Sequence, residues 1–216
     1  MLNANKFYFI IILILEFFFQ VSCNSKVENQ MNEKYDIMFH LIDKHTLPIL
    51  VPPPPPPNGI KDTLFMEREL ILDQLRSDEW KNQKQIIAIK TEFDEINHKD
   101  IPYHDTNIPS EYNFIFNKYL NDRSDEFINI KNIKSTRGNI FLEAPSIQNL
   151  KNNPKLWETF DLIVSFSDVK FNLEKTKAVV YMGISYGKLN GWSAYFLLEK
   201  RKKTWFVKYS NTFQIS

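Results

Sequence analysis

Apolar and polar residues alternate in four separate runs between Leu162 and the end of the chain. Neighbouring residues of a β-strand point to opposite faces, so each run predicts a strand with one apolar face. The breaks over residues 172–175, 187–191 and 200–203 are polar or contain glycine, and their lengths are typical of hairpins. The pattern predicts a four-strand antiparallel meander with one face in the core and the other in solvent. We expect the core face to include Val164, Val180, Phe196 and Val207.

Helical spacing marks three earlier segments. Apolar residues recur every three or four positions from Met31 to Ile42, which predicts a helix over residues 29–44. The same spacing runs from Tyr112 to Leu120 directly after Ser110, and it predicts a helix with one buried face. Residues 62–75 also fit a helix, although the end of this segment fits a strand as well.

Short apolar runs predict further elements between the helices. The β-branched run over residues 85–90 predicts a strand. Residues 128–133 and 139–143 are two more apolar runs, and the turn at Arg137-Gly138 would let them pair. Asn153-Pro154 supplies an N-cap and a first-turn proline for a short helix that ends near Phe160.

Six consecutive prolines occupy positions 52–57 and divide the chain. At about 3.1 Å per residue they predict a stiff polyproline II strut about 19 Å long. Because helices dominate before the strands, the predicted fold class is α+β, with helices packed on one side of an antiparallel sheet that ends in the four-strand meander. We expect residues 1–22 to be a signal peptide, residues 23–60 a tether, helix and polyproline strut, and residues 61–216 a single α+β domain.

The N-terminal segment reads as an export signal. Lys6 precedes residues 7–19, which are apolar apart from Glu16. A helix of that length covers about 20 Å of a bilayer core of about 30 Å, so a signal peptide fits better than a membrane span. The small Ser22 before Cys23, the only cysteine, is typical of a lipobox, in which the cysteine is acylated. We expect a lipoprotein of the bacterial cell envelope; an ordinary signal peptide cleaved nearby, or a retained anchor, is the alternative.

Composition changes this picture in two ways. The chain has 27 Lys+Arg against 26 Asp+Glu, a net charge of +1, so it lacks the basic excess that nucleic-acid binding requires. The single cysteine excludes an internal disulfide, and a lipidated Cys23 would leave the rest of the chain without a thiol, which suits an oxidising compartment.

The C-terminal part of the chain carries a resemblance. The segments 167–172 and 196–200, the pair of glycines Gly187 and Gly191, and the terminal strand are similar to an uncharacterised family of bacterial secreted proteins and predicted lipoproteins. The similarity is limited to the β-meander, about Ser167–Ser216. It implies a folding unit shared among exported proteins, and it implies no catalytic residue.

One window is dense in residue types that serve catalysis or metal binding, and it runs from Thr91 to Asp105. Imidazole and carboxylate together suit a divalent metal, and the candidates are His98, His104, Asp94 and Asp105. The histidines lie six positions apart with a proline between them, unlike the i, i+4 pair of a helical zinc site. We therefore expect a solvated loop, no metal, no cofactor and no catalytic residue.

These observations favour a non-enzymatic binding module, held at the membrane through an N-terminal lipid, with an unknown protein or small-molecule ligand. Aromatic residues opposite the core set would bind that ligand from the outer face of the sheet, and we name Tyr181, Tyr195 and Phe206. Two alternatives remain: a metal-dependent hydrolase that uses residues 91–105, or an immunity or inhibitor protein.

Overall fold

The computed structural model describes residues 32–46, 83–95, 108–121, 124–187 and 190–215. The predicted signal peptide, Cys23, the polyproline strut and the predicted helix over residues 62–75 lie outside this part of the chain. The chain divides into two compact units, Met1–Ile37 and Met38–Ser216, at a point inside a helix over residues 32–45. The sheet and the helices that follow residue 46 belong to the second unit.

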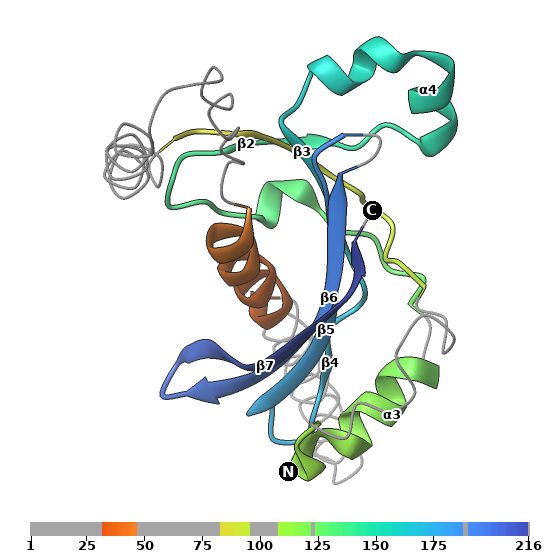
Figure 1. Cartoon of the computed structure of the whole chain (residues 1–216). Coiled ribbons are helices and arrows are strands. Elements are labelled where there is room, and N and C mark those ends of the chain that lie inside the picture. Colours follow the sequence, from red (N-terminus) through yellow and green to blue (C-terminus); the bar gives the residue numbers. More distant parts are fainter. Residues whose placement is uncertain (1–31, 47–82, 96–107, 122–123, 188–189, 216) are drawn as a thin grey trace, which may run out of the picture. The chain divides into compact units, whose positions relative to one another are not determined.

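Seven strands form one mixed sheet in the described part of the chain, in the order β2-β1-β3-β5-β6-β7, with β4 paired to β5 (Figure 1). The strands are β1 (Ile86–Ile89), β2 (Ile140–Glu143), β3 (Leu162–Phe166), β4 (Lys170–Phe171), β5 (Lys177–Ser185), β6 (Gly191–Arg201) and β7 (Thr204–Ile215). Two short α-helices accompany them, α3 (Asn113–Asn121) and α4 (Ile147–Asn152). Three 3-10 turns complete the elements, over Ser110–Tyr112, Ile130–Asn132 and Pro154–Glu158.

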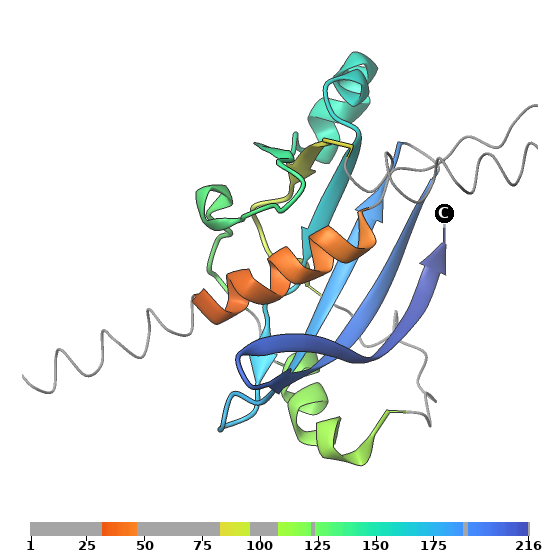
Figure 2. The same ribbon diagram turned by 90° about the vertical axis from the view of Figure 1, so that its left-hand side faces the viewer.

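The C-terminal half of the sheet confirms the predicted meander and the α+β class. β3, β5, β6 and β7 are antiparallel neighbours in chain order, and Figure 2 shows the long blue strands side by side. The register places Val180 opposite Phe196 and Val164 opposite Ile184, so the expected residues share one face. Val164, Val180 and Phe196 are buried, whereas Val207 is half-buried near the end of the sheet.

The N-terminal half of the sheet differs from the prediction, because it is parallel. β1 pairs in parallel with β2 on one side and with β3 on the other. The chain between β1 and β2 includes α3, and the chain between β2 and β3 includes α4; such crossovers return the chain to the same end of the sheet. The predicted pairing of residues 128–133 with 139–143 is therefore wrong.

The segment before β2 forms a 3-10 turn instead of a strand. The Asn129 side chain accepts a hydrogen bond from the Lys131 backbone N–H at 3.1 Å, which caps the turn Ile130–Asn132. A local bond between an asparagine side chain and the backbone offers the chain an alternative to a strand ladder. β2 then finds its partner in β1, with Ile140 opposite Ile86.

The expectation that helices pack on one side of the sheet, with the other side in solvent, is also wrong. One face is covered by α3 (Figure 1). From this helix and its preceding turn, Tyr112, Ile115 and Phe116 pack against Tyr195 and other sheet residues. On the opposite face, the ring of His45 packs 4.8 Å from the ring of Phe196. Alternation shows which face of a strand is apolar, but aromatic residues on the second face can bury it as well when a helix covers them.

The other predicted elements agree with the structure. The first helix runs over residues 32–45, the predicted strand at 85–90 is β1, and the helix after Ser110 begins as a 3-10 turn and continues as α3. Asn153 precedes Pro154 at the start of the predicted short helix, which is of the 3-10 type. In the described residues, no helix has both the length and the apolar character to cross a membrane.

Candidate functional site

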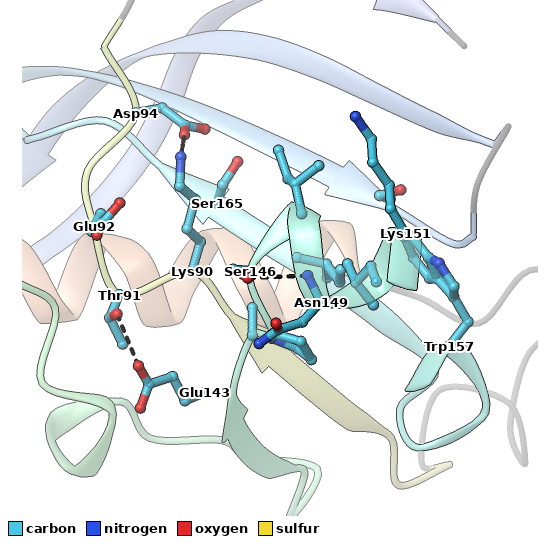
Figure 3. A pocket seen from close by; sticks show the side chains of 16 residues that line it. Lys90, Thr91, Glu92, Asp94, Glu143, Ser146, Asn149, Lys151, Trp157 and Ser165 are labelled. Carbon is cyan, nitrogen blue, oxygen red and sulfur yellow. Dashed lines mark hydrogen bonds and ion pairs between the residues drawn. The ribbon is translucent and has the colours of Figure 1, made fainter. Parts of the chain in front are cut away.

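A groove of about 1280 Å³ opens on one face of the sheet at the carboxyl ends of β1 and β2 (Figure 3). The carboxyl ends of neighbouring parallel strands lie at the same edge of a sheet, and in open α/β sheets this edge is where ligands bind. Three parts of the chain line it: the segment after β1, the segment from Glu143 through α4 to Trp157, and a floor from β3 and β5. The parallel pairing, which the sequence did not predict, is what brings these parts together.

The first wall is the segment that continues β1. Its backbone stays attached to β3, because the Lys90 N–H donates to the Val164 carbonyl at 2.9 Å and the Asp94 N–H donates to the Phe166 carbonyl at 2.8 Å. The Lys90 ammonium forms an ion pair with the Asp94 carboxylate at 2.5 Å. This ion pair engages both side chains, and the Lys90 ammonium and the Asp94 carboxylate give the first wall one group of each charge.

The second wall is α4 and the turn that follows it. The Ser146 hydroxyl accepts a hydrogen bond from the Asn149 N–H at 3.2 Å and so caps the first turn of α4. Leu150 is buried against Ala88 and Phe160, which holds α4 on the sheet. Ile147 is left 69% exposed, so this wall presents an apolar surface to the groove.

Trp157 adds an aromatic ring to the same wall. It is half-buried, and its ring lies 5.7 Å from that of Phe160, which anchors it to the core. An indole fixed on one side and partly open on the other can hold an apolar or flat ligand group with little loss of side-chain entropy.

The floor of the groove is lined by small side chains. Ser165 and Ser185 line it from β3 and β5, and Gly183 lies opposite Ser165 in the register. A Cβ atom at Gly183 would lie 2.8 Å from the Ser165 Oγ and 3.0 Å from the Tyr181 hydroxyl. Glycine therefore leaves room for two hydroxyl groups that a larger residue would displace.

The groove has charges of both signs. Its lining includes the carboxylates of Glu92, Asp94 and Glu143 and the ammonium groups of Lys90 and Lys151. The Thr91 hydroxyl donates to Glu143 at 3.5 Å, a long contact at the edge of the groove. The lining combines hydrogen-bonding groups with an apolar wall, which is the mixture that small-molecule sites use to orient a ligand.

The three aromatic residues predicted to bind ligand do not line this groove. Tyr195 was expected on an exposed face, but it is completely buried beneath α3, so that expectation is wrong. Tyr181 is half-buried beside it, and its hydroxyl lies over Gly183. Phe206 is 44% exposed near the β6–β7 hairpin, where the Arg201 guanidinium lies 5.9 Å from its ring. The structure does not gather these rings into one site.

The window of histidines and carboxylates is described only in part. Asp94 lies in the groove and is paired with Lys90, while His98, His104 and Asp105 lie outside the described residues. Within the described ranges, no three His, Cys, Asp or Glu residues lie close enough together to hold a metal ion. The absence of a metal from residues 96–107 stays a prediction.

Sequence reasoning missed α4, Ser165 and Gly183. The helix is only six residues long and has a single buried residue, Leu150, so it gives almost no periodic signal. The available signal was the cap, since Ser146 follows Pro145 at the end of an apolar run. Comparison of the chain with models of protein families, with curated proteins and with solved structures finds no match.

Proposed function

We propose that the protein is a non-enzymatic binding module of the bacterial cell envelope, anchored by a lipid on Cys23, and that its ligand lies in the groove beside α4. The observation that carries the binding site is the groove itself. Its volume of about 1280 Å³ is enough for a drug-sized molecule or a few residues of peptide.

The chemistry of the lining favours binding over catalysis. Serine hydroxyls line the floor, but a serine becomes a nucleophile only beside an activating base. The amine that lines the first wall, Lys90, is already engaged in an ion pair with Asp94. What the groove offers is hydrogen-bond donors and acceptors next to the apolar surface of Ile147 and Trp157.

A thermal-shift screen of the full mature chain tests the proposed site. The probes are amino acids, monosaccharides and tripeptides, and the comparison variants are Ser165→Phe, which fills the groove, and Ser210→Phe on the exposed side of β7. A ligand at about 100 times its Kd stabilises the folded state by about 2.7 kcal/mol. We expect a probe that raises the Tm of the wild type and of Ser210→Phe but not of Ser165→Phe; a hit that stabilises all three equally would place the site elsewhere.

The anchor is tested separately, because the groove and the lipid are independent proposals. Mass spectrometry of the membrane fraction should find an acylated N-terminal Cys23, and Cys23→Ser should release the protein from that fraction. A mature protein that starts at another residue would contradict the anchor and leave the groove untouched.

A further inference from the structure

A buried arginine closes the carboxyl end of the first helix. The Arg137 side chain is 6% exposed, and its Nη2 donates to the Ile42 carbonyl at 3.3 Å and to the Thr46 hydroxyl at 2.8 Å. Its Nε lies 3.8 Å from an Asp43 carboxylate oxygen. The Ile42 carbonyl also accepts from the Thr46 N–H at 3.0 Å and from the Thr46 hydroxyl at 2.7 Å. Arg137 adds a positive charge at this carboxyl end of the helix, and that charge favours docking of residues 38–46.

A histidine packs the end of this docked segment against the sheet. The His45 ring lies 4.8 Å from the ring of Phe196 and 6.0 Å from that of Trp192, both on β6. Its Nε2 is buried and has no hydrogen-bond partner among the described residues. A neutral imidazole packs here as an aromatic ring, but an imidazolium would place a second N–H donor in a site that offers it no acceptor.

The charges around His45 oppose its protonation. Lys44 and His40 lie on the same helix, and Arg137 occupies the end of that helix, with Tyr186 near the guanidinium. From the sheet, His45 meets the uncharged rings of Trp192 and Phe196. The carboxylate of this cluster, Asp43, is paired with Arg137 and also accepts a hydrogen bond from the Thr136 hydroxyl.

We propose that residues 38–46 are an acid-sensitive latch: the segment stays docked on the sheet while His45 is neutral, and protonation of His45 releases it. The release is local, since the antiparallel strands β5 and β6 keep their pairing and the α3 side of their core. In the sequence this helix follows the segment that carries the proposed lipid anchor, so with that anchor in place acid would loosen the attachment between tether and domain.

The sign of the pH dependence follows from the difference in the pKa of His45 between the docked and the released segment. In the docked state the pKa of His45 is lowered from 6.5 to about 4, chiefly by burial and then by Lys44 and His40. A group whose pKa is depressed by docking stabilises the docked state fully above its free pKa, and this stabilisation is lost as the pH falls toward the docked pKa. The latch therefore weakens between pH 6.5 and about 4.

Hydrogen exchange on the full mature chain at about pH 7 and about pH 4.5, corrected for intrinsic rates, tests the latch. We expect amides of residues 38–46 to lose about tenfold or more of their protection in acid, while amides of β5 and β6 keep theirs. His45→Phe keeps a ring against β6 and cannot titrate, so most of the loss of protection in acid should disappear. The part that remains comes from His40, whose pKa burial also lowers. His40→Gln removes the neighbouring imidazole, which lowers the pKa of His45, so the transition should remain with a slightly smaller loss of protection in acid.

Three results would overturn the proposal. One is a loss of protection that occurs at the same pH in residues 38–46 and in β5 and β6, which would mean global unfolding. Another is an acid transition that keeps its full size in His45→Phe. If His45→Phe does not fold, NMR titration of the wild-type imidazole decides: a midpoint near 6.5 without release of the helix contradicts the latch.

Discussion

The two halves of the sheet are built on different principles. β5, β6 and β7 are 9, 11 and 12 residues long and antiparallel, and the first two of these strands are buried on both faces for most of their length. β1 and β2 have four residues each, run parallel, and leave Ile140 and Leu142 of β2 exposed. The antiparallel half is held by a continuous apolar core. The candidate groove lies beside the parallel strands and extends over β3 to Ser185 of β5. The apolar core and the candidate groove therefore lie largely on different parts of one sheet.

The halves also differ in how helices are attached to them. α3 is held on the antiparallel half by aromatic and aliphatic packing around Tyr195. Next to the parallel half, Arg137 lies shortly before β2 and contacts Gln85, the residue before β1, at 3.4 Å. Polar contacts of Arg137 therefore connect the ends of the short strands to residues 42–46 at the carboxyl end of the first helix.

The largest expected effect comes from emptying the antiparallel core. Phe196→Ala should destabilise the protein by about 3–5 kcal/mol, because the ring is 1% exposed and its loss leaves a cavity beneath His45. Urea denaturation measures the change. Ile140→Ala on β2, where the side chain is 54% exposed, should change stability by about 0.5 kcal/mol or less. Equal costs at the two sites would remove the contrast between the halves.

The second-largest effect on stability is expected from the polar contacts of Arg137 with the end of the first helix. Arg137→Met keeps most of the side-chain volume but leaves Asp43 without its cation, and we expect a loss of about 3 kcal/mol. Arg201→Met breaks the exposed pair with Glu199 and should cost less than about 1 kcal/mol. Denaturation of both variants under the same conditions makes the comparison. If Arg137→Met costs no more than Arg201→Met, the parallel half does not depend on this contact.

A smaller effect is expected at the floor of the groove, where the halves meet. Gly183→Ala places a methyl group 2.8 Å from the Ser165 Oγ, and the crowding should cost about 1–3 kcal/mol. Adding Ser165→Ala to this variant removes the Ser165 hydroxyl that the new methyl group would meet, and should recover part of the lost stability. Thermal unfolding of the single and double variants tests the geometry, and a double variant no more stable than Gly183→Ala would contradict it.

The smallest effect on stability is expected at α4, which forms the second wall of the groove. Ser146→Ala removes the cap of α4 and should cost about 1 kcal/mol. Ser146→Asp supplies another capping oxygen and should restore most of the stability. Hydrogen exchange at the amides of α4 should follow the same order, with a change confined to that helix and the groove beside it.

The meander could be predicted because its signal is local. Each strand carries its own alternation, the breaks have hairpin lengths, and a shift of one residue would turn Val164, Val180 and Phe196 to the wrong face. The first helix and α3 could also be predicted from the sequence, since three or four apolar residues at helical spacing lie within one short segment. The groove gave no such signal, because its floor includes small residues such as Ser165 and Ser185, which are common in any sequence.

By itself, then, the sequence determined the α+β class, the order of the antiparallel strands and the identity of one core face. Only the tertiary structure decided that β1 lies between β2 and β3, that a second face is buried around Tyr195, and that Lys90 and Trp157 face a common groove. The physical reason is the range of the interactions. Periodicity reflects how one segment meets water, whereas the partner of a short parallel strand is selected by contacts with segments some 50 to 75 residues away, such as the bond from the Ile86 N–H to Asp161.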